Sequence, residues 1–252
     1  MGLQQDDTGT WIRLPAAVRR VVSLVPSLTE SVALTAPGLL VGATDWCSEP
    51  AELAVTRVRG TKNPDLAAIL ALHPDLVLAN EEENRATDLD ALRAAGVPVW
   101  VTSPTTVPAA LVSLDRMLTA CGLDRPDWLT EAELAWREPW AGPRRRVVIP
   151  IWRRPWMAVG RDTFTGDVLA RLGLDNVLAG DTERYPRVEL AALPAHDLVV
   201  LPDEPYAFTP TDGPEAFAAP AVCVSGRHLT WYGPSLVAAR AALAAQLWPD
   251  QG

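Results

Sequence analysis

Short runs of Val, Leu and Ile alternate with longer segments of helical spacing along most of the chain. Such runs are too short for helices and are typical of buried parallel strands. The longer segments begin and end at ordinary helix signals, such as Pro at a start or Gly just after an end. This alternation predicts parallel sheets with flanking helices. The helices are expected at Ser27–Ala36, Leu66–Leu72, Ala86–Ala95, Phe164–Leu172 and Ser235–Leu247.

The order of these segments occurs twice, which predicts a duplicated fold. Four pairs of matching positions lie 126, 135, 122 and 123 residues apart: Arg20 and Arg146, Gly38 and Gly173, Asp75 and Asp197, Val99 and Val222. One such match could arise by chance, but four in the same order indicate two similar halves. We therefore predict an α/β protein of two Rossmann-like lobes, each a parallel sheet with helices on both faces.

A helical stretch, Thr105–Gly142, separates the two halves. Its second part, Asp127–Trp140, follows Pro126 and contains few helix breakers. About 15 helical residues would span roughly 22 Å, enough to join two lobes. The predicted organisation is an N-terminal extension (1–18), an N-lobe (19–122), a single long linker helix (123–143) and a C-lobe (144–252). A single helical crossing predicts a stiff protein with limited closure.

Composition and charge narrow the function. The formal net charge of −9 argues against nucleic acid or an anionic membrane surface as the main partner. No apolar stretch approaches the roughly 18 residues of a membrane span, so no membrane insertion is expected. The sequence contains no nucleotide-binding, hydrolase or metalloprotease motif, so we expect the protein to have no catalytic activity and no intrinsic cofactor. The first ten residues lack a secretory signal, which predicts a cytoplasmic protein, or a periplasmic or extracellular one if a leader was removed.

Tryptophan is overrepresented, with ten residues against three Tyr and three Phe. In doubly wound lobes, ligands bind beyond the carboxyl ends of the strands. Four Trp residues follow predicted strands, and we expect them to face a ligand: Trp46, Trp152, Trp156 and Trp231. Large flat rings suit stacking on a planar ligand. The other six, including Trp128 and Trp136 in the linker region, are expected to be structural.

Polar residues at the same predicted strand ends complete the candidate ligand site. Arg can clamp carboxylates or phosphates, and Phe164 or Tyr232 could add a wall to the site. The further candidates are Lys62, Glu83, Asn84, Arg85, Arg153, Phe164 and Tyr232. Alternative interpretations remain open: the acidic residues before a helix could serve its dipole, and Asn63 could be a helix N-cap. Cys47 and His228 are weak metal-ligand candidates, against an inert thiol and a plain hydrogen-bonding imidazole.

Several segments together resemble the Fe/B12-type periplasmic binding proteins with a helical backbone, and within them a helical-backbone metal receptor subgroup. They are RVVSLVPSLTE, LLVGATDWCSEP, RGTKNPDLAAILALHPDLVLAN and HLTWYGPSLVAARAAL, and the resemblance covers Arg19 to Leu247. It implies the class III architecture, two lobes joined by one long helix with a ligand between them. It also implies a monomer that binds without catalysis.

The ligand implied by this resemblance is a bulky metal chelate, with a cobalamin-like corrinoid as first choice and haem or a ferric siderophore as alternatives. An ABC permease would then be the protein partner. Transport members carry one exposed Glu in each lobe for permease docking, whereas Ala67 occupies the expected N-lobe position here. Glu189 fits the C-lobe position only after a one-residue shift. These departures favour, as a further alternative, a cytosolic sensor or enzyme built on the same fold.

Overall fold

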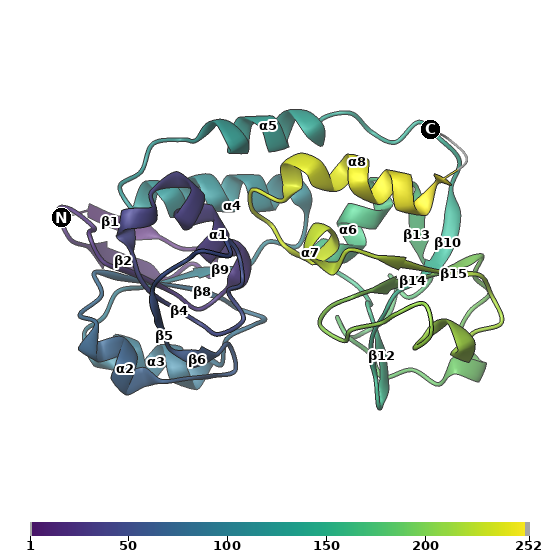
Figure 1. Cartoon of the computed structure of the whole chain (residues 1–252), viewed down its shortest axis with the longest axis horizontal. Coiled ribbons are helices and arrows are strands. Elements are labelled where there is room, and N and C mark those ends of the chain that lie inside the picture. Colours follow the sequence, from purple (N-terminus) through teal and green to yellow (C-terminus); the bar gives the residue numbers. More distant parts are fainter. Residues whose placement is uncertain (1, 250–252) are drawn as a thin grey trace. The chain divides into compact units, whose positions relative to one another are not determined.

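The computed structural model describes residues 2–249, and the chain divides into two compact units (Figure 1). Unit 1 comprises the chain up to Pro104, together with Ala110–Thr130 and Tyr232–Pro234. Unit 2 comprises Thr105–Ala109, Glu131–Trp231 and the chain from Ser235 onward. The segment Tyr232–Pro234 therefore belongs to unit 1, although its neighbours in the sequence on both sides belong to unit 2.

Unit 1 is built on a five-stranded parallel sheet. Its strand order is β5 (Thr56–Arg57), β4 (Leu40–Ala43), β3 (Val21–Ser23), β8 (Leu76–Asn80) and β9 (Val99–Thr102). One face carries α1 (Pro26–Thr35) and α4 (Val107–Ala120), and the other carries α2 (Leu66–Ala71) and α3 (Ala86–Ala94) (Figure 1). A 3₁₀ turn, η1 (Pro37–Leu39), precedes β4, and the short hairpin of β6 (Arg59–Gly60) and β7 (Asn63–Pro64) follows β5.

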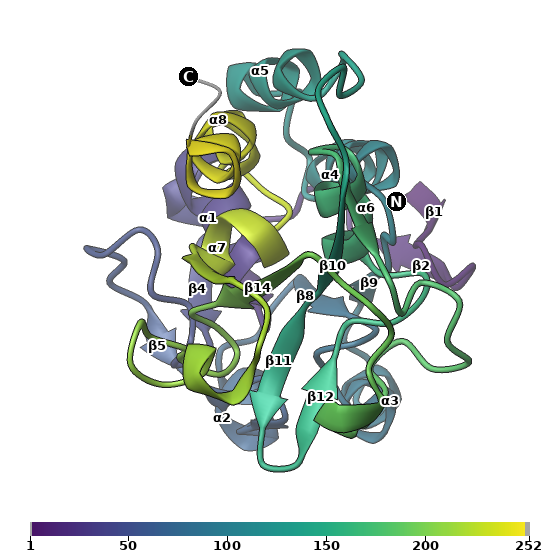
Figure 2. The ribbon, with the colours of Figure 1, turned by 90° about the vertical axis from the view of Figure 1, so that its right-hand side faces the viewer.

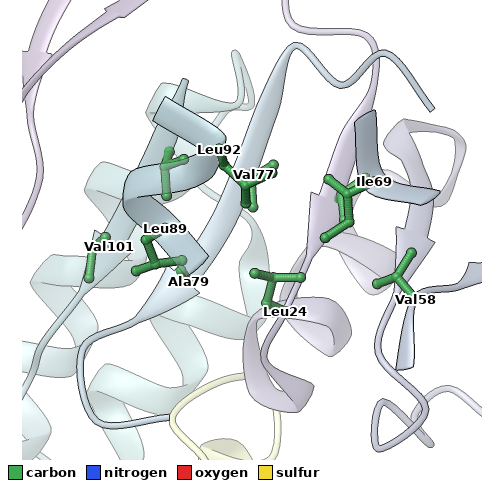
Figure 3. Close-up of a cluster of buried hydrophobic side chains, with 10 residues drawn as sticks. Leu24, Val58, Ile69, Val77, Ala79, Leu89, Leu92 and Val101 are labelled. Carbon is green, nitrogen blue, oxygen red and sulfur yellow. The ribbon is translucent and has the colours of Figure 1, made fainter. Parts of the chain in front are cut away.

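The core on the α2–α3 face explains why these segments fold as they do. Ile69 from α2 and Leu92 from α3 are fully buried against Val77 and Leu24 of the sheet side (Figure 3). A surface helix is stabilised mainly by burying such an apolar face rather than by its intrinsic propensity. The alternation seen in the sequence therefore corresponds to one layer of strands covered by helices.

Unit 2 repeats the strand arrangement with four parallel strands, but α-helices cover one face of its sheet, whereas the sequence predicts helices on both faces. The order is β13 (Leu174–Asn176), β10 (Arg145–Val148), β14 (Leu198–Pro202) and β15 (Ala221–Val224). Three helices lie on one face: α6 (Phe164–Ala170), α7 (Gly226–Thr230) and α8 (Leu236–Leu247) (Figure 1). Outside the sheet are the antiparallel hairpin of β11 (Pro150–Arg153) and β12 (Trp156–Ala158), and the 3₁₀ turns η2 (Leu190–Ala192) and η3 (Pro214–Ala216) (Figure 2).

The duplication is confirmed by equivalent hydrogen bonds within each unit. In unit 1 the Asp75 carboxylate accepts a hydrogen bond from the Arg20 amide (3.0 Å), and the Asp75 amide donates to the Arg20 carbonyl (2.8 Å). In unit 2 Asp197 and Arg146 repeat both contacts at 2.9 and 2.8 Å. Since the strand order β4-β3-β8-β9 also matches β13-β10-β14-β15, the predicted α/β fold of two similar halves is correct.

The predicted linker region contains a shorter helix than expected. α5 covers Asp127–Ala135, nine residues, because Pro139 has no amide hydrogen and disfavours helical geometry just before it. The indole of Trp128 donates to the Thr35 hydroxyl (3.0 Å), and that of Trp136 donates to the Leu236 carbonyl (2.9 Å). The structural role expected for these two residues is therefore confirmed. The limits 19–122, 123–143 and 144–252 remain predictions.

The predicted N-terminal extension contains a hairpin that the sequence pattern did not reveal. β1 (Gly2–Gln5) pairs with β2 (Trp11–Leu14), and the connecting turn is fixed to β9. The Asp7 amide donates to the Val101 carbonyl (3.1 Å), and the Val101 amide donates to the Asp6 carboxylate (3.2 Å). This turn therefore satisfies the outward-facing backbone groups of an edge strand, a common protection against unwanted strand pairing.

Replacing Asp7 by alanine is expected to destabilise unit 1 by about 2 kcal/mol. The Asp7 carboxylate is only 11% exposed, pairs with Arg116 at 2.8 Å and accepts from the Ser103 amide at 3.0 Å. Its removal takes away the carboxylate that pairs with Arg116 and the acceptor of the half-buried Ser103 amide. Urea denaturation measures the change, with Asp124→Ala, at an exposed position, as a control expected to lie within about 0.5 kcal/mol of the wild type. Equal midpoints for Asp7→Ala and the control would contradict this role.

Candidate ligand site at the strand ends

Trp46 is a large exposed aromatic side chain at the carboxyl-end edge of the sheet in unit 1. It follows β4 in a short turn and is 68% exposed. A Cβ added to Gly60 would lie 3.3 Å from Trp46 Nε1, so the indole lies beside the β6–β7 hairpin. An indole held at its edge with most of its surface accessible is suited to stacking against a flat ligand.

The loop after β8 is held by two asparagines. The Asn80 side-chain oxygen accepts from the amides of Glu82 (2.8 Å) and Glu83 (3.1 Å). Asn84 is buried; its oxygen accepts from the Asn80 amide (2.9 Å), and its nitrogen donates to the Thr61 carbonyl (3.0 Å). The polar atoms of Asn84 are thus used within the protein, and this predicted ligand contact instead shapes the loop.

The charged candidates of unit 1 remain near the surface. Lys62 and Arg85 are exposed and Glu83 is half-buried. The Lys62 ammonium donates to the Glu82 carbonyl (2.5 Å), which connects the turn of the β6–β7 hairpin to the loop after β8. The suggestion that Asn63 caps the following helix is wrong. The N-cap of α2 is Asp65, whose carboxylate accepts from the Ala68 amide (3.0 Å), because the β6–β7 hairpin occupies Asn63.

Cys47 lies inside unit 1, where its thiol contacts two hydroxyl groups. It is fully buried, accepts from the Thr29 hydroxyl (3.0 Å) and lies 3.2 Å from the Thr44 hydroxyl. Burial raises the pKa of this thiol above its ordinary value, so the protonated form is favoured. Among residues 2–249, no three His, Cys, Asp or Glu side chains gather in a way that could hold a metal ion.

Cys47 is accordingly expected to resist alkylation in the native protein. Iodoacetamide at pH 7.5, followed by peptide mass spectrometry, should modify Cys223, which is half-buried, at least about tenfold faster than the buried Cys47 and Cys121. All three should react alike after denaturation in urea. Rapid modification of native Cys47 would indicate a reactive, accessible thiolate, which could then act as a metal ligand.

In unit 2 the predicted Trp and Arg segment forms a hairpin rather than a loop after the strand. β10 ends at Val148, and Arg153 pairs with Trp156 across β11 and β12. Trp152 is 43% exposed and contacts Tyr206 edge to face at 5.7 Å. The alternation of residues in this hairpin places Trp152 and Arg153 on opposite sides.

Arg153 and Trp156 serve the packing of this hairpin. Arg153 is 18% exposed and forms ion pairs with Asp212 and Glu215. Its guanidinium also lies 5.5 Å from the Trp156 ring, which stacks on Phe208 at 6.0 Å. The charge of Arg153 is therefore compensated inside the unit, while Trp152 carries the accessible aromatic surface of the hairpin.

A polar cluster that the sequence analysis missed follows β14 and β15. The Asp203 carboxylate accepts from the Gly226 amide (2.6 Å). The Glu204 carboxylate accepts from the Thr230 hydroxyl (3.3 Å) and from the Trp231 indole. Burial raises the pKa of Glu204 above its ordinary value. The duplication of the sequence could have revealed this cluster. Asp203 lies 122 residues after Glu81, the same separation as between Asp75 and Asp197, so it occupies the matching strand end of the second half.

The remaining candidates of the C-terminal half are largely enclosed. Phe164 begins α6 and is buried, next to the N-cap Thr163, and Trp231 is buried. His228 is half-buried in α7, where burial and then the neighbouring Arg227 lower its pKa. Tyr232 is buried in unit 1, where its hydroxyl contacts Asn80 (2.7 Å) and Thr102 (2.8 Å). The structure therefore brings Tyr232 to the strand ends of unit 1 and Trp231 to those of unit 2.

Two shallow grooves lie within single units and include none of the predicted site residues. The first, of about 310 Å³ in unit 1, lies between the β1–β2 hairpin and α4 and is lined by Trp11, Trp100 and Arg116 among others. The second, of about 390 Å³ in unit 2, is lined by Met157, Asp181, Tyr185 and Arg187 among others. Neither groove includes the residues that follow the strands.

The chain is similar in sequence to vitamin B12-binding proteins. It is 28% identical over 188 residues to that of Yersinia pestis, a match that spans 70% of this chain and 66% of the relative's length, just under two thirds. The match to the protein of Yersinia pseudotuberculosis has the same extent. No protein-family model matches the chain. No helix in the described residues is both long and apolar enough to cross a membrane.

Solved structures share the fold at low sequence identity. The periplasmic vitamin B12-binding protein BtuF of Vibrio cholerae has a TM-score of 0.74 at 18% identity, covering 92% of this chain and 98% of that one. The periplasmic haem-binding protein RhuT of Roseiflexus has a TM-score of 0.70 at 19% identity, covering 92% and 99%. Helicobacter pylori CeuE with Ni(II) bound has a TM-score of 0.82 at 13% identity, covering 99% and 90%. The chain is thus similar in sequence to vitamin B12-binding proteins and shares the α/β fold of these periplasmic binding proteins.

Proposed function

We propose that this chain is a non-catalytic receptor for a bulky, partly planar metal chelate, a corrinoid first and haem second. The observation that carries the proposal is the exposed Trp46 indole at the strand-end edge of unit 1. It occurs in a chain similar to proteins named for vitamin B12 binding, with the fold of proteins named for vitamin B12 and haem binding. The chain carries its own aromatic and charged groups at this edge and needs no intrinsic cofactor for such binding.

The chemistry of unit 1 suits such a ligand. A corrin or porphyrin ring presents a flat face to an indole, and stacking of this kind contributes about 1 kcal/mol beyond area burial. The exposed Lys62 and Arg85 are placed to attract carboxylate or phosphate groups at the ligand's periphery. Glu83 is proposed to accept hydrogen bonds from amide groups of the ligand.

Unit 2 is proposed to contribute aromatic surface from its hairpin. Trp152 is the accessible ring there, and Trp156 and Arg153 support it through stacking and ion pairs. Glu204, held by Trp231 and Thr230, is an added candidate for hydrogen bonding to the ligand. Phe164 and Trp231 are buried and are proposed to support the ligand-contacting residues of unit 2 by packing.

One feature favours a second candidate, a receptor or sensor that acts without an ABC permease. Ala67 lies exposed on α2, at the position where transport members carry a docking Glu. Glu189 is exposed just before η2. A single acidic position would give a weaker electrostatic match to a permease than two, since docking charges act mainly on the association rate.

Ligand titration tests the proposed function. The intrinsic Trp fluorescence of the purified protein is followed during addition of aquocobalamin, cobinamide, haemin or a ferric hydroxamate siderophore. Saturable quenching at micromolar or lower concentration by aquocobalamin, cobinamide or haemin is expected. Quenching by the siderophore alone would mean that the ligand is a siderophore rather than a corrinoid or haem. The absence of a saturable response to all four compounds would overturn the proposal.

A further inference from the structure

Asn80, the last residue of β8, organises the loop that carries the candidate ligand contacts of unit 1. Its side-chain oxygen accepts from the amides of Glu82 and Glu83, at 2.8 and 3.1 Å. Its side-chain nitrogen donates to the Thr102 carbonyl (3.0 Å) and to the Tyr232 hydroxyl (2.7 Å). Two donors and two acceptor contacts fix the amide plane, so the start of the loop depends on the orientation of this one side chain.

The Tyr232 hydroxyl joins a directed chain of hydrogen bonds. It accepts from Asn80 Nδ2, so its own proton points to Thr102 Oγ1 (2.8 Å), which in turn donates to the Ala79 carbonyl (3.1 Å). The hydroxyl is fully buried, and burial raises its pKa, so it stays a neutral donor and acceptor. Such connected networks hold their members more firmly than separate hydrogen bonds do.

Close packing fixes the backbone that carries Tyr232. A Cβ on Gly233 would lie 3.0 Å from both the Ser27 carbonyl oxygen and the Ser31 hydroxyl oxygen of α1. The segment Tyr232–Pro234 is thus seated against unit 1, 152 positions along the chain from Asn80. A remote segment inserted in this way provides a rigid support for the loop that its own neighbours in sequence do not supply.

From this network we infer that Tyr232 is a positioning residue for the ligand-binding loop 81–85, and that it acts through Asn80 rather than by touching the ligand. The inference rests on the proposed function for its binding consequence, but its structural consequence can be measured without any ligand. Loss of the hydroxyl removes one of the four hydrogen bonds that fix the Asn80 amide, so its oxygen holds the Glu82 and Glu83 amides less firmly. The loop that presents Glu83 and Arg85 then becomes mobile.

The test compares Tyr232→Phe with Tyr185→Phe, which makes the same change at a half-buried tyrosine of unit 2 that lines a groove away from the strand ends. Hydrogen exchange with mass spectrometry, without ligand, should show exchange about tenfold faster in peptides covering residues 81–85 of Tyr232→Phe and no change there in Tyr185→Phe. Peptides from α2 should exchange as in the wild type. Unchanged exchange at 81–85 in Tyr232→Phe would overturn the inference, whatever the protein binds.

Binding supplies the second readout. Dissociation constants for aquocobalamin and haemin, from fluorescence titration, should rise about tenfold in Tyr232→Phe and stay unchanged in Tyr185→Phe. Thr102→Val, which removes the other partner of the same hydroxyl, should reproduce both effects. If exchange at 81–85 accelerates while wild type and variants alike bind neither probe, the positioning role holds and the proposed function fails. If the wild type binds and loop exchange accelerates but affinity is unchanged, the binding part of the inference is overturned.

Discussion

Replacing Trp46 by alanine is expected to weaken binding of aquocobalamin or haemin about thirtyfold, corresponding to ~2 kcal/mol. Trp46 is 68% exposed in unit 1, so its ring surface is available to a ligand and contributes little to the packed core. The variant should therefore fold with nearly the stability of the wild type. Isothermal titration calorimetry measures the affinity, and thermal unfolding checks the fold.

Trp11 offers a matched control for this experiment. It is 62% exposed, and it lies on the β1–β2 hairpin rather than after a strand of the sheet. Trp11→Ala removes the same side chain from a similarly exposed position and should leave both affinities within about twofold of the wild type. Equal affinity losses in the two variants would mean that the ligand does not stack on Trp46.

Replacing Gly226 by alanine is expected to destabilise unit 2 by about 3 kcal/mol. A Cβ at this position would lie 2.3 Å from Glu204 Cγ and 2.8 Å from the Glu204 amide nitrogen. One of these neighbours is backbone, so the overlap cannot be relieved by a side-chain rotation alone. The displacement would also break the bond from the Gly226 amide to Asp203 (2.6 Å) and pull Glu204 away from Trp231 and Thr230.

Gly180 serves as the control because a Cβ there meets nothing within 4 Å. Gly180→Ala should keep the wild-type unfolding midpoint or raise it slightly, since alanine restricts the unfolded chain. Chemical denaturation followed by far-UV circular dichroism distinguishes the two variants. A midpoint for Gly226→Ala equal to that of Gly180→Ala would show that the strand ends of unit 2 are loosely packed.

The periodic parts of the fold could be predicted from the sequence because burial imposes a pattern on them. The helix predicted at Ala86–Ala95 is α3, Ala86–Ala94, and the helix predicted at Phe164–Leu172 is α6, Phe164–Ala170. Gly96 and Gly173, both with positive φ, follow these helices as expected of C-terminal glycines. Asp75 and Asp197, one of the four pairs that predict the duplication, make equivalent hydrogen bonds.

Features that depend on contacts between distant segments could not be predicted in this way. The β1–β2 hairpin is fixed by Asp6 and Asp7 contacting Val101, about 95 positions away, and no local pattern reports such a contact. The sequence places Trp152 and Trp156 in a loop after a strand, whereas they lie in the hairpin of β11 and β12. This hairpin could not be predicted because it lacks the usual Asn-Gly turn signal. The position of Tyr232 after the last predicted strand favours a ligand contact, whereas its burial reflects its insertion into unit 1.

Hydrogen exchange of the ligand complex tests most directly whether the strand ends bind the ligand. Wild-type protein saturated with aquocobalamin, or with haemin if only that binds, is compared with ligand-free protein. We expect protection in peptides covering residues 44–48 and 81–85 of unit 1 and 203–206 and 226–231 of unit 2. Peptides covering 4–11 and 115–119, which line the groove beside the β1–β2 hairpin, should not change. Protection confined to that groove, or none at the strand ends of either unit, would contradict the account.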